Sequence, residues 1–181
     1  MTVERDKWIK DNMADAVRAT AGSGIFPQTL LTQAILESQG PVNGIYIPGQ
    51  ADLAKKYNNY FGIQADSSWT GTKVKMSDKN AAGQVYQTYF RTYRTKYDSF
   101  KDYVKFLQTN PRYKKAFLQT NPTDQLKAIA ASGYAEAPNY TTLLLSVLSS
   151  VDRNTDTQTA GAGAGLLLAF ALAAIFTQLN R

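Results

Sequence analysis

One carboxylate is notable because it ends an otherwise apolar helical stretch. Glu37 closes the segment 26–40, in which apolar residues recur at the spacing of one helix face. Pro27 suits a first helical turn, and Gly40 with Pro41 predicts that the helix ends just after Glu37. At a helix C-terminus the backbone dipole disfavours an ionised carboxylate, and apolar surroundings act in the same direction. We therefore expect Glu37 to have the raised pKa that a general acid needs.

The composition limits the chemistry that can accompany this acid. The sequence contains no cysteine and no histidine. Disulfides, thiolate nucleophiles and imidazole ligands or bases are therefore absent, which excludes the Ser-His-Asp and zinc-hydrolase mechanisms. We expect no metal and no cofactor. Carboxylate pairs are the usual means of hydrolysing glycosidic bonds, so the composition favours that chemistry.

Four blocks of sequence, in order, resemble those of one enzyme family. They are residues 33–38 around Glu37, residues 58–64, the run 90–93 with 98–103 and 110–113, and residues 133–140. Over about residues 26–150 the chain resembles the bacterial glucosaminidase domain, glycoside hydrolase family 73. The resemblance implies an endo-acting N-acetylglucosaminidase. Its partner is the peptidoglycan glycan strand, in which it cleaves the β-1,4 bond between N-acetylglucosamine and N-acetylmuramic acid.

The resemblance also implies catalytic residues. Glu37 matches the general acid, and Tyr134 matches a tyrosine that lies beside the acid and orients substrate or water. The family often places its second carboxylate, a Glu, upstream of the Phe-Arg-x-Tyr block. Here the nearest acidic residue is Asp78, which the hairpin pattern places in a turn, and Asp66 is the other candidate. Action by Glu37 alone, with a positioned water and a neutral substrate group, is a further option.

Other matching positions are expected to bind substrate. An Asn amide can bond a sugar N-acetyl group, a Phe ring can stack on a sugar, and Gly allows close backbone approach, although a structural turn explains the same residues. A Trp can cover a sugar or pack inside the β-lobe. After Tyr134 the family's Thr-Asp is replaced by Glu136-Ala137, which moves the carboxylate one position earlier. The predicted substrate-binding residues are Asn59, Phe61, Gly62, Trp69, Glu136 and Tyr140.

The elements that must position these residues are mainly helical. Helical patterns cover residues 4–20, 26–40, 51–57, 99–109, 111–118, 123–131 and 139–151. Ser99 and Asp102 resemble a capping box at the start of the fourth of these. Two β-like runs, 72–76 and 84–90, flank a turn at 77–83. We expect a mainly α (α+β), lysozyme-like helical domain with a small β-hairpin lobe over residues 1–151.

A polar linker at 152–159 and a C-terminal apolar helix are expected after this domain. Residues 160–176 carry no charge. Seventeen helical residues span about 26 Å, slightly short of a hydrocarbon core near 30 Å. We interpret 160–178 as a transmembrane helix or one packed in a hydrophobic assembly. Alternatives are a helix held by another protein or laid across the domain.

The predicted location is the bacterial cell envelope, with membrane association through this segment. The charged N-terminus lacks the apolar core of a signal peptide, which suits delivery by a secretion machine or phage particle. The formal net charge of +6 attracts polyanions such as the cell wall. No stretch combines dense Lys and Arg with a nucleic-acid motif, so we expect no nucleic-acid partner. A lytic transglycosylase and a catalytically silent wall-binding or assembly module are alternative functions.

Overall fold

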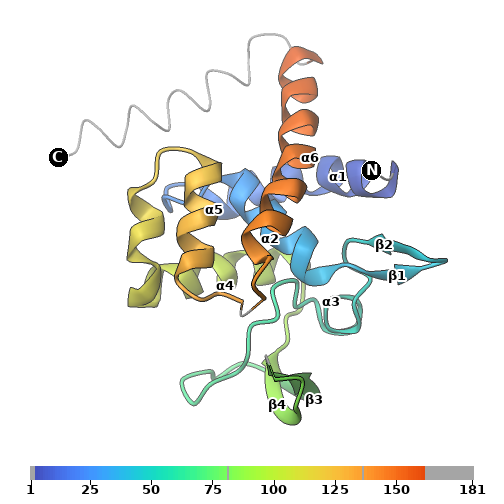
Figure 1. Ribbon diagram of the computed structural model, residues 1–181, viewed down its shortest axis with the longest axis vertical. Helices are drawn as coiled ribbons and strands as arrows, with labels where there is room; N and C mark the ends of the chain where they lie inside the picture. The colour runs from blue at the N-terminus through green and yellow to red at the C-terminus, as the bar shows by residue number, and fades with distance from the viewer. Residues whose placement is uncertain (1–2, 81, 136, 162–181) are drawn as a thin grey trace.

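The computed structural model describes residues 3–80, 82–135 and 137–161, with side chains up to residue 155. The elements in chain order are α1 (Val3–Thr20), α2 (Pro27–Ser38), β1 (Gly40–Val42), β2 (Ile45–Ile47), α3 (Asp52–Tyr57), β3 (Lys73–Lys79), β4 (Val85–Arg91), α4 (Lys96–Thr109), the 3-10 helix η1 (Pro111–Leu118), α5 (Pro122–Ala131) and α6 (Tyr140–Gly161). Figure 1 shows a helical body from which the β3–β4 hairpin projects. The prediction of a mainly helical domain with a small hairpin lobe is confirmed.

Helix α2 lies at the centre of the body, beside α1, α5 and α6 (Figure 1). Most of its residues are buried, including Leu30, Leu31 and Ile35, which are fully inaccessible to solvent. Burying one such side chain stabilises the fold by about 1.5–3 kcal/mol. The helix ends at Ser38, so Glu37 occupies its last turn, as the sequence predicts. A largely buried helix therefore carries the candidate acid.

The β-lobe is an antiparallel hairpin whose strands are longer than expected. β3 continues to Lys79 and pairs Asp78 with Tyr86 on β4. The turn begins only at Asn80, whose side chain accepts a hydrogen bond from the Gln84 amide at 2.9 Å. The prediction that Asp78 lies in a turn is therefore wrong, because Asn80 supplies the turn-forming side chain two residues later.

Helix α4 begins earlier than predicted. Thr95 is its N-cap and accepts a hydrogen bond from the Asp98 amide at 3.1 Å, while its hydroxyl donates to the Asp98 carboxylate at 2.7 Å. The capping box predicted at Ser99 and Asp102 is wrong because Thr95 and Asp98 offer the same spacing one turn earlier. Ser99 is buried and accepts a hydrogen bond from the Tyr60 amide at 3.2 Å.

Helix α6 continues through residues 152–159, which were predicted to form a linker. No Gly or Pro interrupts the sequence between 141 and 160. The Asn154 amide donates to the Asp6 carboxylate on α1 and to the Ser150 carbonyl, both at 2.9 Å, which holds this part of the helix against the body. The predicted apolar helix at 160–178 lies outside the described residues from position 162 onward. Among the residues that the structure describes, no helix meets the length and hydropathy required of a membrane span.

Candidate active site

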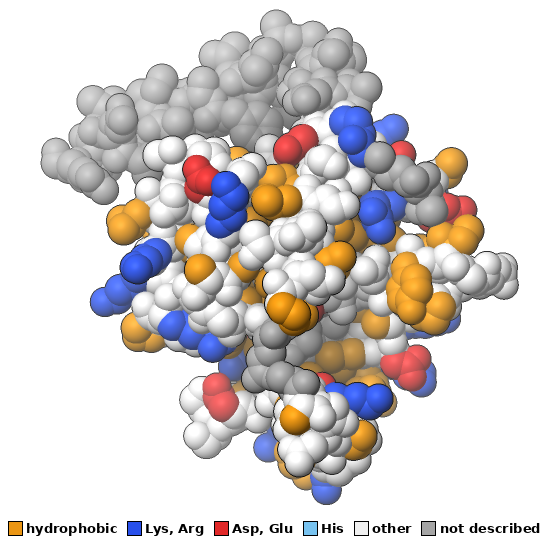
Figure 2. Space-filling model, in the orientation of Figure 1, with side chains coloured by type: hydrophobic (Ala, Val, Ile, Leu, Met, Phe, Trp, Pro, Cys, Tyr) orange, Lys and Arg blue, Asp and Glu red, His pale blue; other side chains and the backbone are white. Residues whose placement is uncertain are grey.

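A cleft of about 880 Å³ separates the helical body from the β-lobe. Lys and Arg side chains are spread over both parts on the face shown in Figure 2. The cleft volume is within the range of small-ligand sites, about 300–1,000 Å³. Among the described residues, three carboxylates line it: Glu37 from the body, Asp78 from the hairpin and Asp66 from the segment before it. The cleft therefore brings together Glu37 and the two candidates for the second carboxylate.

Glu37 is partly buried in the cleft wall. Burial raises the pKa of its carboxyl group from 4.5 to about 7, and a hydrogen bond from Tyr140 opposes the rise. The Tyr140 hydroxyl donates to Glu37 Oε1 at 2.6 Å. The raised pKa expected from the sequence is present, and removal from water is its main cause. Glu37 can therefore hold a proton near neutral pH.

A chain of buried hydrogen bonds holds the Glu37 carboxylate. Gln33, one helical turn earlier and fully buried, donates from Nε2 to the Tyr140 hydroxyl oxygen at 2.8 Å. Its Oε1 accepts a hydrogen bond from the Tyr103 hydroxyl. Because Gln33 supplies a proton to the Tyr140 oxygen, the Tyr140 proton points toward Glu37. No role was predicted for Gln33 or Tyr103, although Gln33 shares a helix face with Glu37 at the i, i+4 spacing.

Tyr134 and Tyr140 form a stacked pair beside Glu37. Their ring centroids are 6.3 Å apart and their planes differ by 2°. The Tyr134 hydroxyl donates to the Phe61 carbonyl at 3.1 Å, and its ring lines the cleft. Tyr140, predicted to bind substrate, is thus the tyrosine bonded to the acid, whereas the hydroxyl of Tyr134 ties the cleft wall to the loop at Phe61.

Asp78 faces the cleft from the opposite wall. Its carboxylate accepts hydrogen bonds from Gln64 Nε2 and the Tyr86 hydroxyl, each at 3.0 Å, and from the Lys79 amide at 2.8 Å. Asp66 is more exposed: its Oδ1 accepts from the Ser68 amide at 2.9 Å and from the Ser68 hydroxyl at 2.6 Å. These bonds lower the pKa of Asp66. The lobe thus supplies two candidate partners for Glu37.

The loop before the lobe contains Asn59 and Phe61, which were both predicted to bind sugar. The buried Asn59 amide donates to the Ile63 and Arg91 carbonyls at 3.0 and 2.9 Å, and its oxygen accepts from the amides of Phe61 and Ile63. Asn59 therefore holds the loop, which is the structural alternative. Phe61 is buried and stacks on Tyr103 at 4.1 Å, so its ring packs in the core, although the residue contributes to the cleft lining.

Gly62 lines the cleft at a φ of 64°, in the left-handed region that favours glycine. Trp69 is not part of the cleft lining; it borders a neighbouring hollow, where its ring lies under the Arg91 guanidinium at 4.6 Å. Glu136 lies outside the described residues. Arg112 and Tyr113 also line the cleft and were not predicted. The one sequence signal for these two residues was their place in the Asn-Pro-Arg-Tyr block at 110–113.

Comparisons with known proteins identify the family of this chain. The sequence model of the glucosaminidase family, described as mannosyl-glycoprotein endo-beta-N-acetylglucosaminidase, matches residues 13–153. The chain is 33% identical to the peptidoglycan hydrolase FlgJ of Vibrio parahaemolyticus, over 76% of this chain and 44% of FlgJ. The chain thus spans less than half the length of this relative.

Solved structures share the fold. The glycoside hydrolase domain of FlgJ from Salmonella typhimurium superposes with a TM-score of 0.64 at 25% identity, covering 91% of this chain and 98% of that domain. A peptidoglycan hydrolase mutant from Sphingomonas sp. A1 gives a TM-score of 0.65 at 25% identity, covering 84% of this chain and 99% of that one. Sequence and fold agree, and the chain belongs to the glucosaminidase family of glycoside hydrolases.

Proposed function

We propose that this chain hydrolyses peptidoglycan at the β-1,4 bond between N-acetylglucosamine and N-acetylmuramic acid, with Glu37 as general acid. The observation that carries the proposal is the Glu37 carboxyl on the cleft wall, whose pKa burial raises to about 7. The family description supplies the N-acetylglucosamine linkage, and the names of the relatives supply the wall polymer. The site of action is accordingly the bacterial cell envelope, where a net charge of +6 favours an anionic wall.

In this mechanism Glu37 donates its proton to the glycosidic oxygen as the bond from that oxygen to the anomeric carbon breaks. Positive charge develops on the sugar ring, and an ionised carboxylate on the opposite wall stabilises it or takes a proton from the attacking water. We assign that second role to Asp78. Water adds its oxygen to the anomeric carbon, and the two carboxyl groups return to their starting states by proton exchange with solvent.

The Tyr140 hydroxyl assists the proton transfer. Once Glu37 has lost its proton, the 2.6 Å hydrogen bond from Tyr140 stabilises the anion that remains. Gln33 keeps that hydroxyl oriented toward Glu37. Burial and this hydrogen bond thus act in opposite directions, which leaves the acid able both to hold and to release its proton near neutral pH.

The test is mass spectrometry of purified peptidoglycan digested by the full chain and by Glu37→Gln. The proposal expects reducing-end N-acetylglucosamine fragments from the native chain and almost none from the variant. Reducing-end N-acetylmuramic acid would refute the assigned bond. Intact glycan strands with retained binding would refute catalysis and support a wall-binding or assembly module.

A lytic transglycosylase is the second candidate function. It needs one acid and leaves an anhydro sugar whose mass is lower by one water. The observation that favours it is the asymmetry of the two walls: Glu37 has the raised pKa of a proton donor, whereas Asp78 is already engaged by three donors from its own lobe. Anhydro-sugar ends in the same digest, together with full activity of Asp78→Asn, would establish this alternative.

A further inference from the structure

A second hollow of about 420 Å³ adjoins the cleft. Asp66 and Phe106 line both spaces, so they form the border between them. Its remaining walls come from the segment at Ser68 and Trp69, from Arg91, and from the exposed end of α4. A group that branches from a chain lying in the cleft can therefore enter the hollow without leaving the protein surface.

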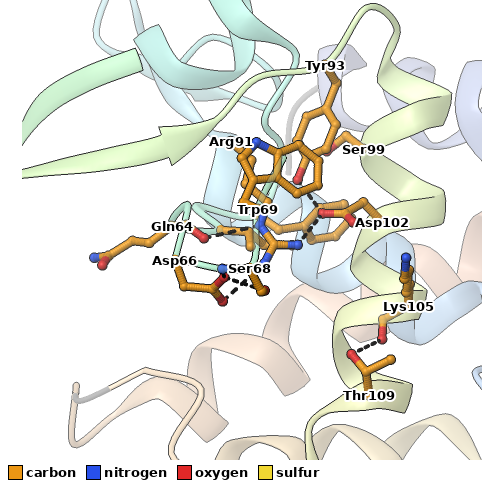
Figure 3. Close-up of polar contacts among 12 residues, drawn as sticks. Gln64, Asp66, Ser68, Trp69, Arg91, Tyr93, Ser99, Asp102, Lys105 and Thr109 are labelled. Atoms are coloured by element: carbon orange, nitrogen blue, oxygen red, sulfur yellow. Dashed lines mark hydrogen bonds and ion pairs between the residues drawn. The ribbon is translucent and has the colours of Figure 1, made fainter. Parts of the chain in front are cut away.

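The back of this hollow is a fixed ion pair. Arg91 donates to the Asp102 carboxylate at 3.0 Å and to the Gln64 carbonyl at 3.2 Å, and both charged side chains are about nine-tenths buried. The Tyr93 hydroxyl also donates to Asp102, at 2.6 Å. Figure 3 shows these groups converging, with the Trp69 ring against Arg91. Their charges neutralise one another, so the back wall is preformed and has no net charge.

Asp66 and Lys105 are charged side chains of opposite sign at the front of the hollow. Asp66 has a side chain that is 61% exposed, and its contact with Arg91 is long, at 3.5 Å. The hydrogen bonds from Ser68 keep the pKa of Asp66 low, so it is ionised at neutral pH. Lys105 is exposed on α4, and among the described residues it forms no ion pair. Asp66 and Lys105 both line the hollow, and Figure 3 shows them apart, on different segments of the chain.

Such a charge arrangement does not suit a neutral sugar, which offers hydroxyl and amide groups only. It suits a zwitterion with a carboxylate and an ammonium group some distance apart. In peptidoglycan, the peptides attached to N-acetylmuramic acid are substituents of this kind, and they branch from the glycan that the cleft would hold. We propose that the hollow is a subsite for the stem peptide, in which Lys105 binds a peptide carboxylate and Asp66 binds a peptide ammonium group. This inference rests on the proposed function.

The experiment compares two substrates cleaved by the full chain: soluble glycan strands that carry stem peptides, and the same strands after an amidase has removed the peptides. The quantity measured is the ratio of kcat/KM for the peptide-bearing strands to that for the stripped strands. Lys105→Gln and Asp66→Asn should each lower this ratio about three- to tenfold, the effect of losing one charge-assisted contact at a partly exposed site. Asp66→Asn keeps the oxygen that accepts from Ser68, so the turn is preserved.

Lys10→Gln is the matched control, because Lys10 is exposed on α1 and borders neither space. Its ratio should equal that of the native chain. Amidation of the stem carboxylates should lower the native ratio and have no further effect on Lys105→Gln. Unchanged ratios in both hollow variants would overturn the subsite while leaving the hydrolase intact. Failure of the native chain to cleave either substrate would instead remove the proposed function, and the subsite with it.

Discussion

The two walls of the cleft hold their carboxylates in different ways. On the body side, Glu37 belongs to a helix that is buried on almost every face, and it is linked through Tyr140 to the fully buried Gln33. On the lobe side, Asp78 lies in a two-stranded hairpin whose outer face is exposed. Burial therefore gives the Glu37 carboxyl its affinity for a proton, against the opposing hydrogen bond from Tyr140, whereas Asp78 is held by donors of its own lobe.

The packing of the two regions differs in the same way. The body surrounds α2 with large apolar side chains such as Leu30 and Ile35. The hairpin is fixed to the body near its base, where Phe90 is buried and Arg91 pairs with Asp102. Regions with few buried apolar contacts open more readily than a core. The acid therefore lies in the more firmly packed wall.

The largest expected effect comes from removing the proton donor itself. Glu37→Gln keeps the size of the side chain and can still accept from Tyr140, but it cannot donate a proton to the leaving oxygen. We expect peptidoglycan cleavage to fall about 10²–10⁴-fold, the usual contribution of a general acid, measured as release of reducing ends. Glu4→Gln on exposed α1 is the control and should retain activity. Comparable loss in both variants would show that the effect is not specific to the cleft.

Glu37→Gln should also show how much the burial of the Glu37 carboxyl lowers the stability of the folded chain. The pKa of Glu37 is about 7 in the folded chain against a reference value of 4.5, so the folded state binds more protons between these pH values. Stability of the native chain must therefore fall, relative to Glu37→Gln, as pH rises from about 4.5 to 7, by on the order of 3 kcal/mol in total. Urea unfolding of both proteins at pH 4 and pH 8 measures this difference. A difference that does not change with pH would contradict the raised pKa.

On the lobe side, Asp78→Asn tests whether the exposed wall supplies the second carboxylate. We expect activity to fall about 10²-fold, the lower end of the range for acid–base groups, because Asp78 is only half-buried and solvent shares part of the task. The matched control is Ser77→Ala, since Ser77 precedes Asp78 on β3 and points to the opposite face of the hairpin. Full activity of Asp78→Asn would assign the role to Asp66 or to no lobe carboxylate.

The two walls also differ in what their sequences predict. The position of Glu37 follows from local signals: apolar periodicity along α2, Pro27 at its start, and Gly40 with Pro41 after its end. The existence of the hairpin follows from its β-like runs, but its turn was misplaced because several turn-forming residues compete between Ser77 and Gly83. Local sequence signals thus predict which elements form, but not the residues at which each element ends.

The contacts that control the chemistry are not local. Tyr140 reaches Glu37 across 103 positions of sequence, and Tyr103 reaches Gln33 across 70. No periodicity relates residues so far apart, so only the family resemblance indicated that the Tyr140 segment belonged to the site. Asn59 is the opposite case: its residue type suited a sugar ligand, yet backbone groups of its own loop and of Arg91 on β4 use all its hydrogen bonds.

The smallest expected effect tests the link between the network and the acid. Tyr140→Phe removes the hydrogen bond that stabilises ionised Glu37, while burial, which raises the pKa, remains. Activity that needs protonated Glu37 declines above pH 7 in the native chain, and in the variant this decline should move upward by about one pH unit. The rate below pH 6 should change only a few-fold, because Glu37 is protonated there in both proteins. The Tyr134→Phe variant supplies the contrast, since its lost hydroxyl bonds the Phe61 carbonyl, and its decline should stay near pH 7. If both variants shift equally, the stacked pair as a whole, and not the single bond to Glu37, sets the acidity of the buried wall.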